Sequence, residues 1–340
     1  IVIQGDSDIT LPNAYTVNPA GFIYDAFGGE WTEVLGLPKN MNGPCAETLN
    51  NYMYSIGGST GSSQTNVYRY DGSTWTEVAG LPAARLFQAA AVLSNRLYAI
   101  GGSQGAGGLA NVYCFNGTNW TETAALPAAC QNLAAATLGG YIYAIGGSPD
   151  GATAQTNVYR FDGSSWTEVA GLPAGRFELA AGTLGNYIYA VAGTISYTAQ
   201  TNVYRFDGSS WTEVTGLPVS WRRLACAVLD DRLYAFDGYL GSAQTNVYCF
   251  DGSAWHETAG VPAARYFAAG AVLDDNVYAM GGYNGGQQSN VYRYTAQTGV
   301  LPSSGSWTGG YPVVIAGANL CNGGDVTNVT LCGVAVQAIT

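Results

Sequence analysis

The chain has 340 residues, of which only 10% are charged and 47% are hydrophobic, and its formal net charge is −11. This negative balance argues against nucleic acid as a partner, because phosphate binding requires clustered Lys and Arg, and against anionic membrane surfaces. No run of about 18 apolar residues is present, so we expect no membrane insertion. The hydrophobic content and the 47 glycines indicate a compact β-protein rather than a disordered chain.

The first 20 residues do not resemble the rest of the chain. They contain two strand-like segments, Ile1–Ile3 and Asn13–Val17. The sequence begins at Ile1 without a Met or a signal peptide, so we expect a processed, trimmed or partial chain. A third strand-like segment, Phe22–Tyr24, has no clear place in the pattern that follows.

Tryptophans recur at a nearly constant interval from residue 31 to residue 255. They are Trp31, Trp75, Trp120, Trp166, Trp211 and Trp255, spaced 44, 45, 46, 45 and 44 residues apart. A period of about 40–50 residues built from strand-like units is typical of a propeller or a solenoid.

One repeat, residues 85–120, contains four strand candidates. A small-residue segment, Leu86–Leu93, precedes Leu97–Ile100, which ends at a glycine pair; the third segment is Asn111–Phe115. Asn116-Gly117 is a hairpin turn signal, replaced by Asp-Gly in other repeats, and leads to the strand at Trp120. Four strands in about 45 residues make one propeller blade.

Strand counting predicts how the propeller closes. The chain contains six inner hairpins, but no Trp follows the last third strand, Asn290–Tyr294. The missing outer strand is present at the other end as Trp31–Val34. We therefore predict an all-β, six-bladed propeller whose last blade is completed by an N-terminal strand, which also removes an exposed sheet edge.

These repeats resemble the Kelch family. The family pattern of an Arg, a small-residue strand, a Tyr, a glycine pair, a Tyr-Asp segment and a Trp appears in order as Arg85, Tyr98, Gly101-Gly102, Tyr68 to Asp71, and Trp75. The resemblance covers about residues 20–300, and we place the propeller domain at 21–300. Departures from the pattern are local: Ala192-Gly193 and Asp237-Gly238 replace glycine pairs, and Met41 and Cys130 replace the Arg.

Residues 301–340 do not continue the repeat. Their segments GGYPVVIAGANL and DVTNVTLCGV resemble the opening half of an IPT/TIG domain, an immunoglobulin-like sandwich, and residues 1–20 resemble its closing half. The halves occur in inverted order, so we predict a partial sandwich formed from the chain ends. Three completions are open: closure within one chain, strand sharing with other copies of the chain in head-to-tail filaments, or neighbouring repeats of a longer tandem protein.

The sequence predicts no catalytic site, cofactor or metal. The single histidine, His256, takes the place of a Thr in other repeats, and one histidine cannot supply the two-histidine copper site of a Kelch-family oxidase. Glutamates recur in register after each Trp, which favours a structural role, and we expect them to pair across strands with Arg69, Arg160, Arg205 and Arg293.

The asymmetric positions are the candidate ligand site. The Kelch resemblance implies that ligands dock where the Arg position and the loops after the glycine pairs converge. Arginines and aromatic residues there would suit an acidic peptide or an anionic glycan; the alternative is that they pack the central channel. The candidates are Arg85, Arg176, Arg265, Trp221, Arg222, Phe177, Tyr266, Tyr239 and Tyr283.

The cysteines and sequons give weaker predictions. Cys321 and Cys332 are a possible disulfide, whereas Cys45, Cys114, Cys226 and Cys249 are expected to be unpaired, small hydrophobic residues. Possible glycosylation sites are Asn116, Asn119 and Asn328.

Together these observations predict a non-catalytic extracellular or cell-surface protein with a structural or adhesive role. The alternative is a propeller that binds a glycan or an acidic peptide. A third class, an intracellular substrate adaptor, would bring a partner-recruiting domain, which we do not find in the sequence.

Overall fold

The computed structural model describes residues 28–105 and 107–296, together with the backbone of four two-residue strands in the flanking segments. Those strands form two small hairpins: β1 (Thr10–Leu11) with β2 (Tyr15–Thr16), and β29 (Thr330–Leu331) with β30 (Val334–Ala335). The predicted IPT/TIG halves as domains, Phe22–Tyr24, Cys321, Cys332 and Asn328 lie outside the described residues. The chain divides into two compact units, and the larger one, Trp31–Trp255 with Gly260–Tyr294, is the propeller.

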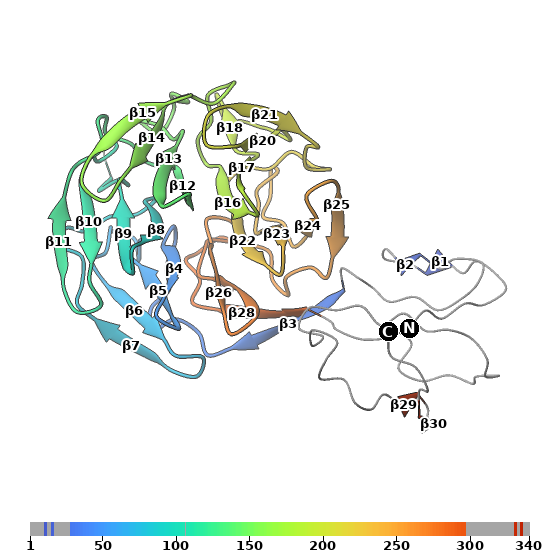
Figure 1. Ribbon diagram of the computed structural model, residues 1–340. Helices are drawn as coiled ribbons and strands as arrows, with labels where there is room; N and C mark the ends of the chain where they lie inside the picture. Colours follow the sequence, from blue (N-terminus) through green and yellow to red (C-terminus); the bar gives the residue numbers. More distant parts are fainter. Residues whose placement is uncertain are drawn as a thin grey trace. The chain divides into compact units, whose positions relative to one another are not determined.

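The propeller consists of six four-stranded sheets arranged around a central axis (Figure 1). We number these sheets as blades 1–6 in chain order, and each runs from an innermost to an outermost strand. Blades 1–3 comprise β4 (Cys45–Leu49), β5 (Tyr52–Ile56), β6 (Val67–Tyr70) and β7 (Trp75–Val78); β8 (Ala89–Leu93), β9 (Arg96–Ile100), β10 (Val112–Phe115) and β11 (Trp120–Thr123); and β12 (Ala134–Leu138), β13 (Tyr141–Ile145), β14 (Val158–Phe161) and β15 (Trp166–Val169).

The other three blades follow the same order. They comprise β16 (Ala180–Leu184), β17 (Tyr187–Val191), β20 (Val203–Phe206) and β21 (Trp211–Val214); β22 (Ala225–Leu229), β23 (Arg232–Phe236), β24 (Val247–Phe250) and β25 (Trp255–Thr258); and β26 (Ala269–Leu273), β27 (Asn276–Met280), β28 (Val291–Ala296) and β3 (Gly29–Val34). A small extra hairpin in blade 4 joins β18 (Thr194–Ile195) to β19 (Thr198–Ala199).

Blade 6 confirms the predicted closure. Its outermost strand is β3, which lies beside β28, so that the blue start and the orange end of the propeller chain share one sheet (Figure 1). Trp31 is buried against Tyr294 and against Phe236 of blade 5, with ring centroids 5.2 and 5.7 Å apart. The side chain of Asn290 also donates a hydrogen bond to Glu33. Blade 6 therefore has four strands like the other blades, and it joins the two ends of the propeller chain.

Aromatic pairs join the blades to one another. At every junction a tyrosine of one blade's second strand meets an aromatic residue of the next blade's third strand, with ring centroids 5.3–6.0 Å apart. Pairs of this kind are worth about 0.5–1.5 kcal/mol beyond their buried area. The pairs are Tyr54–Phe115, Tyr98–Phe161, Tyr143–Phe206, Tyr189–Phe250, Tyr234–Tyr294 and Tyr278–Tyr70.

The tryptophans of blades 1–5 attach their outer strands to the preceding blade connection. The indole Nε1 of Trp120, for example, donates to the carbonyl of Ala79, and four other tryptophans make the equivalent bond at 2.9–3.0 Å. This repeated contact explains why the Trp spacing identifies the blades. The same hydrogen bond gives the indole N–H an acceptor, which a partly buried tryptophan usually needs.

The expected pairing of the repeated glutamates with arginines is wrong. In the blade 1 register, Glu77 lies opposite Tyr68, and Arg69 lies opposite Thr76. Because adjacent residues of a strand point to opposite faces, Glu77 and Arg69 are on different faces of the sheet. Glu77 accepts a hydrogen bond from Asn66 instead, and Arg69 lies 4.4 Å over the Tyr52 ring.

Candidate functional site

A closed ring of six backbone hydrogen bonds surrounds one end of the central channel. The ring contains one residue from each blade connection, two positions before the innermost strand. The amide of each ring residue donates to the carbonyl of the equivalent residue in the preceding blade at 2.8–3.0 Å. Its members, which we name the mouth ring, are Gly43, Phe87, Asn132, Glu178, Arg223 and Phe267.

Every member of the mouth ring has a positive φ, between 53° and 60°. L-residues rarely adopt this left-handed conformation, which costs about 1 kcal/mol or more, so the inter-blade hydrogen bonds must maintain it. Gly43 is required for a second reason. A Cβ atom there would lie 2.6 Å from the Phe87 ring, which packs over this position against Phe267 with centroids 4.4 Å apart.

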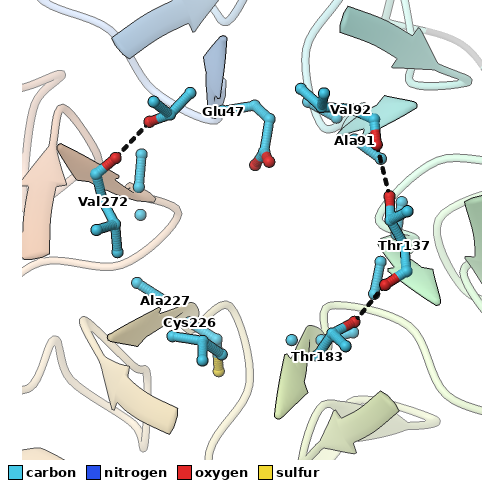
Figure 2. A pocket seen from close by; sticks show the side chains of 17 residues that line it. Glu47, Ala91, Val92, Thr137, Thr183, Cys226, Ala227 and Val272 are labelled. Atoms are coloured by element: carbon cyan, nitrogen blue, oxygen red, sulfur yellow. Dashed lines mark hydrogen bonds between the residues drawn. The ribbon is translucent and has the colours of Figure 1, made fainter. Parts of the chain in front are cut away.

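Below the mouth ring, the innermost strands enclose a channel with a cavity volume of about 290 Å³. At the position where the other five blades carry Ala or Gly, β4 carries Glu47, and Figure 2 shows its carboxylate pointing into the open channel. Burial raises the pKa of Glu47 to about 7. The Glu47 side chain is half-buried: the innermost strands enclose it, but it can still be reached from the channel.

Threonines connect neighbouring innermost strands across the channel wall. The Thr137 hydroxyl donates to the Val92 carbonyl, and the Thr183 hydroxyl donates to the Thr137 carbonyl, both at 2.8 Å (Figure 2). Thr48 makes the same bond to Val272. The three remaining junctions have Val at this position.

Charged and aromatic side chains gather on the blade 4–6 side of the mouth ring. Glu178, nearly buried, accepts from Arg223 Nε at 2.9 Å and lies 3.5 Å from Arg222 Nη1. The guanidinium carbon of Arg223 lies 5.3, 5.4 and 4.8 Å from the ring centroids of Tyr239, Tyr266 and Phe267. We name this set the mouth cluster: Glu178, Arg222, Arg223, Tyr239, Tyr266, Phe267 and Tyr283.

The rings of the mouth cluster form one connected wall. Tyr266 contacts Tyr239, Tyr283 and Phe267 with centroid separations of 4.9, 5.6 and 5.7 Å. Burial raises the pKa of Tyr266, so its hydroxyl stays protonated at neutral pH and can donate a hydrogen bond. The cluster therefore presents cationic and hydroxyl donors beside flat apolar faces.

The structure separates the nine predicted ligand-site residues into two groups. Arg222, Tyr239, Tyr266 and Tyr283 lie in the mouth cluster and are partly exposed. The other five are at most 2% exposed and pack between or within blades: Arg85, Arg176, Arg265, Trp221 and Phe177.

The buried arginines are fixed by their own blades. Arg85 Nη1 donates to the carbonyls of Gly101 and Asn111 at 2.8 and 3.1 Å, and its guanidinium carbon lies 4.3 Å over the Tyr113 ring. Arg265 repeats this arrangement, and its Nε lies 4.0 Å from the fully buried Asp237 carboxylate. Arg176 donates instead to the Asn202 and Tyr204 side chains.

Sequence reasoning missed Arg223, Glu178 and Phe267, which follow the predicted residues by one position. The signal that would have found them is the column two residues after the Arg position, where the six repeats carry five different residue types: Gly, Phe, Asn, Glu, Arg and Phe. It also missed Glu47, the one charged residue in an otherwise small-residue column.

Comparison with known proteins now identifies the fold family. A family model described as the DUF6242 beta propeller domain matches residues 31–298. The chain belongs to this family. A solved structure, that of YjhT, is similar to the DUF6242 propeller with a TM-score of 0.67 at 16% sequence identity, covering 77% of this chain and 95% of the other. This likeness concerns the fold alone. No curated protein matches the sequence.

Other sites predicted for this DUF6242 propeller can be located in part. Cys45, Cys114, Cys226 and Cys249 are free thiols, as predicted, and so is Cys130. Asn116 begins the β10–β11 turn, where its side-chain oxygen accepts from the amides of Thr118 and Asn119. Among the described residues, no cluster of acidic, Cys and His side chains suits a metal ion, and no helix could span a membrane.

Proposed function

We propose that this chain is a non-catalytic binding propeller whose mouth cluster holds a carboxylate-bearing ligand. The observation that carries the proposal is the state of Arg223. Glu178 holds its Nε, whereas its Nη atoms hydrogen-bond to no described residue. With Nε held by Glu178, the two Nη groups of Arg223 remain available as donors. A guanidinium in this state can bind a carboxylate through two parallel hydrogen bonds.

The aromatic wall supports the choice of ligand. Tyr239, Tyr266 and Phe267 surround the Arg223 guanidinium, so a bound carboxylate would carry the rest of its ligand across their rings. Such rings pack against the flat face of a sugar or a peptide unit. An acidic peptide and an anionic glycan share the required carboxylate, and the cluster contains hydroxyl donors for either.

Titration calorimetry with two probes would test this function: a polyglutamate peptide and a polyuronate oligosaccharide. The variant Arg223→Ala should weaken binding of the preferred probe about 10- to 100-fold, the cost of 1.4–2.8 kcal/mol expected for a charged hydrogen-bonded contact. Arg96→Ala is the matched control, because Arg96 is an exposed arginine at the β8–β9 turn. Equal affinities for all three proteins, or no binding of either probe, would refute the proposal.

A structural or adhesive role remains the second candidate, and one observation favours it. The flanking segments 1–27 and 297–340 join β3 and β28, which are neighbouring strands of one blade. Adjacent attachment would allow the two predicted IPT/TIG halves to combine with each other or with those of another copy. Analytical ultracentrifugation over a concentration series would distinguish a monomer from head-to-tail assembly.

Two finer assignments complete the proposal. We propose that the blades are Kelch repeats, because the Trp position follows that pattern in all six blades, the glycine pair in four and the Arg in three. We also propose an extracellular or cell-surface location, supported by the low charge content and the repeated β-architecture. Fractionation of the native source, with detection by an antibody against the propeller, would test the location.

A further inference from the structure

Arg85, Arg176 and Arg265 each stand four residues before the innermost strand of their blade, and the other three blades have different residue types at this position. Met41 and Trp221 are 0% and 1% exposed and occupy the space with apolar side chains. Trp221 packs on Tyr248 with ring centroids 5.2 Å apart. In blade 3 the residue is Cys130, whose short side chain reaches the Gly146 carbonyl but does not fill the space that an arginine occupies in blades 2 and 6.

A cavity of about 220 Å³ lies where the missing arginine would be. Its wall includes Gly146, Asn157 and Tyr159. These are the blade 3 equivalents of the glycine and asparagine whose carbonyls accept from Arg85, and of the tyrosine under its guanidinium. The cavity thus has the groups that bind a guanidinium in blades 2 and 6, without the guanidinium.

The exposure of the tyrosines supports this reading. In the five blades where Arg, Met or Trp covers it, the equivalent tyrosine is 2–6% exposed. Tyr159 is the exception and is only half-buried. The cavity also reaches the surface, because its wall includes the exposed residues Ala128, Ala129 and Pro149.

The charge at the site fits a cation. Glu168 lies opposite Tyr159 in the β14–β15 register, just as Glu122 lies opposite Tyr113 in the blade that contains Arg85. The Cys130 thiol donates to the Gly146 carbonyl at 3.2 Å, and burial raises its pKa to about 12, so it contributes no competing charge at neutral pH. An aromatic face, two carbonyls and a nearby carboxylate are what a guanidinium requires.

We propose that the blade 3 cavity beside Cys130 binds the guanidinium group of an external ligand. The guanidinium would stack on Tyr159 and donate to the carbonyls of Gly146 and Asn157, replacing the arginine that other blades supply from their own chain. Its source is either the arginine side chain of a partner polypeptide or a small guanidinium compound. This site is in blade 3 and is independent of the mouth cluster on blades 4–6.

Ligand-detected NMR and titration calorimetry with ethylguanidinium would test the proposal. We expect saturable one-to-one binding with a dissociation constant near 1 mM, about −4 kcal/mol, and weaker binding of ethylammonium, which lacks the planar donor fork. Cys130→Arg should fill the cavity from within, raise the melting temperature and weaken binding at least about tenfold. Cys130→Met should weaken binding equally, because it fills the same space as Met41 does in blade 1.

The remaining arms separate the ligand sources. An Arg-containing hexapeptide that binds more tightly than ethylguanidinium would indicate a polypeptide partner, and equal affinities would indicate a small compound. Absence of saturable binding to the wild-type protein would overturn the proposal. So would binding that persists unchanged in both Cys130→Arg and Cys130→Met, because these variants act on the cavity in different ways.

Discussion

The two halves of the mouth share one backbone but differ in their side chains. In blades 1–3 and in blades 4–6, the mouth ring has the same hydrogen bonds and the same positive φ values. The residue before each ring member also bridges to the following loop in every blade. These bridges are Asn42–Ser59, Leu86–Ser103 and Gln131–Ser148 in the first half, and Phe177–Thr194, Arg222–Tyr239 and Tyr266–Tyr283 in the second.

Because the hydrogen bonds are the same in both halves although the side chains differ, the ring depends on its backbone groups and accepts several side-chain types. The repeated layers beneath it, the aromatic pairs and the tryptophan bonds, fix the blades without the mouth residues. Apart from Gly43, the ring positions carry different side chains in different blades, and in this chain two arginines and four aromatic rings lie on one side of the mouth. Binding sites on variable connections above a rigid scaffold follow the same logic.

We expect the largest loss of stability from a change in the closing blade, because both halves of the mouth depend on a closed propeller. Trp31→Ala removes a buried side chain that packs on Tyr294 and Phe236 in the closing blade. We expect a loss of about 3–5 kcal/mol in the free energy of unfolding, measured by urea denaturation. Replacing the neighbouring exposed Glu30 by Ala should change it by less than about 0.5 kcal/mol. A small loss for Trp31→Ala would mean that closure does not depend on this strand.

The next effect concerns Glu47, which breaks the symmetry of the channel below the mouth. Because its pKa is raised to about 7, the folded state holds a proton that the unfolded state releases near pH 4.5. Stability should therefore fall as pH rises from about 4.5 to about 7 and then level off. Glu47→Gln should remove this dependence and stabilise the protein at pH 8 by about 1–3 kcal/mol. Identical pH profiles for both proteins would contradict the prediction.

A smaller effect should follow from removing the charge that anchors the arginine side of the mouth. Glu178→Gln keeps the size of the side chain but leaves Arg222 and Arg223 without their carboxylate. Because both arginines are partly exposed, we expect a loss of only about 1–2 kcal/mol in thermal or urea unfolding. The matched control, Glu77→Gln on an exposed outer strand, should be nearly neutral. Equal losses would indicate that Glu178 has no special role.

The smallest effect distinguishes blade junctions joined by threonine from those with valine. Thr137→Val removes one inter-blade hydrogen bond and keeps the shape of the side chain. The expected loss is about 0.5–1.5 kcal/mol by urea denaturation. The reverse change, Val228→Thr, introduces a hydroxyl at an equivalent junction and should be neutral or slightly stabilising. If Thr137→Val stabilises the protein, the threonine bonds do not contribute to the channel wall.

Most of the fold could be predicted from the sequence, because each blade repeats the physical constraints that identify it. Trp120 marks an outer strand since its indole must reach a carbonyl of the preceding connection. Asp71 marks a turn since its carboxylate accepts from the amides of Ser73 and Thr74. Even the closure by Trp31–Val34 could be predicted by counting strands.

The site could be predicted only in part. The Arg85 position could be predicted from the sequence, but its side chain is buried and donates to the carbonyls of Gly101 and Asn111 in its own blade. Two residues after this position the backbone is left-handed in every blade, and outside blade 1, where Gly43 is found, inter-blade hydrogen bonds maintain it without a glycine. A single residue type therefore does not mark this position, and only the variation along its column in the six repeats could have pointed to Arg223 and Glu178.

The closing pair of strands has a mechanical consequence. Thr32 bonds to Arg293 and Glu33 to Asn290, so β3 and β28 run in opposite directions, and the start of one lies beside the end of the other. The flanking segments therefore leave from the same end of this pair. Because hydrogen bonds between antiparallel strands are perpendicular to them, tension between the flanks would open these bonds one at a time, like a zipper. Blade 6 should be the first blade to yield when the chain is stretched.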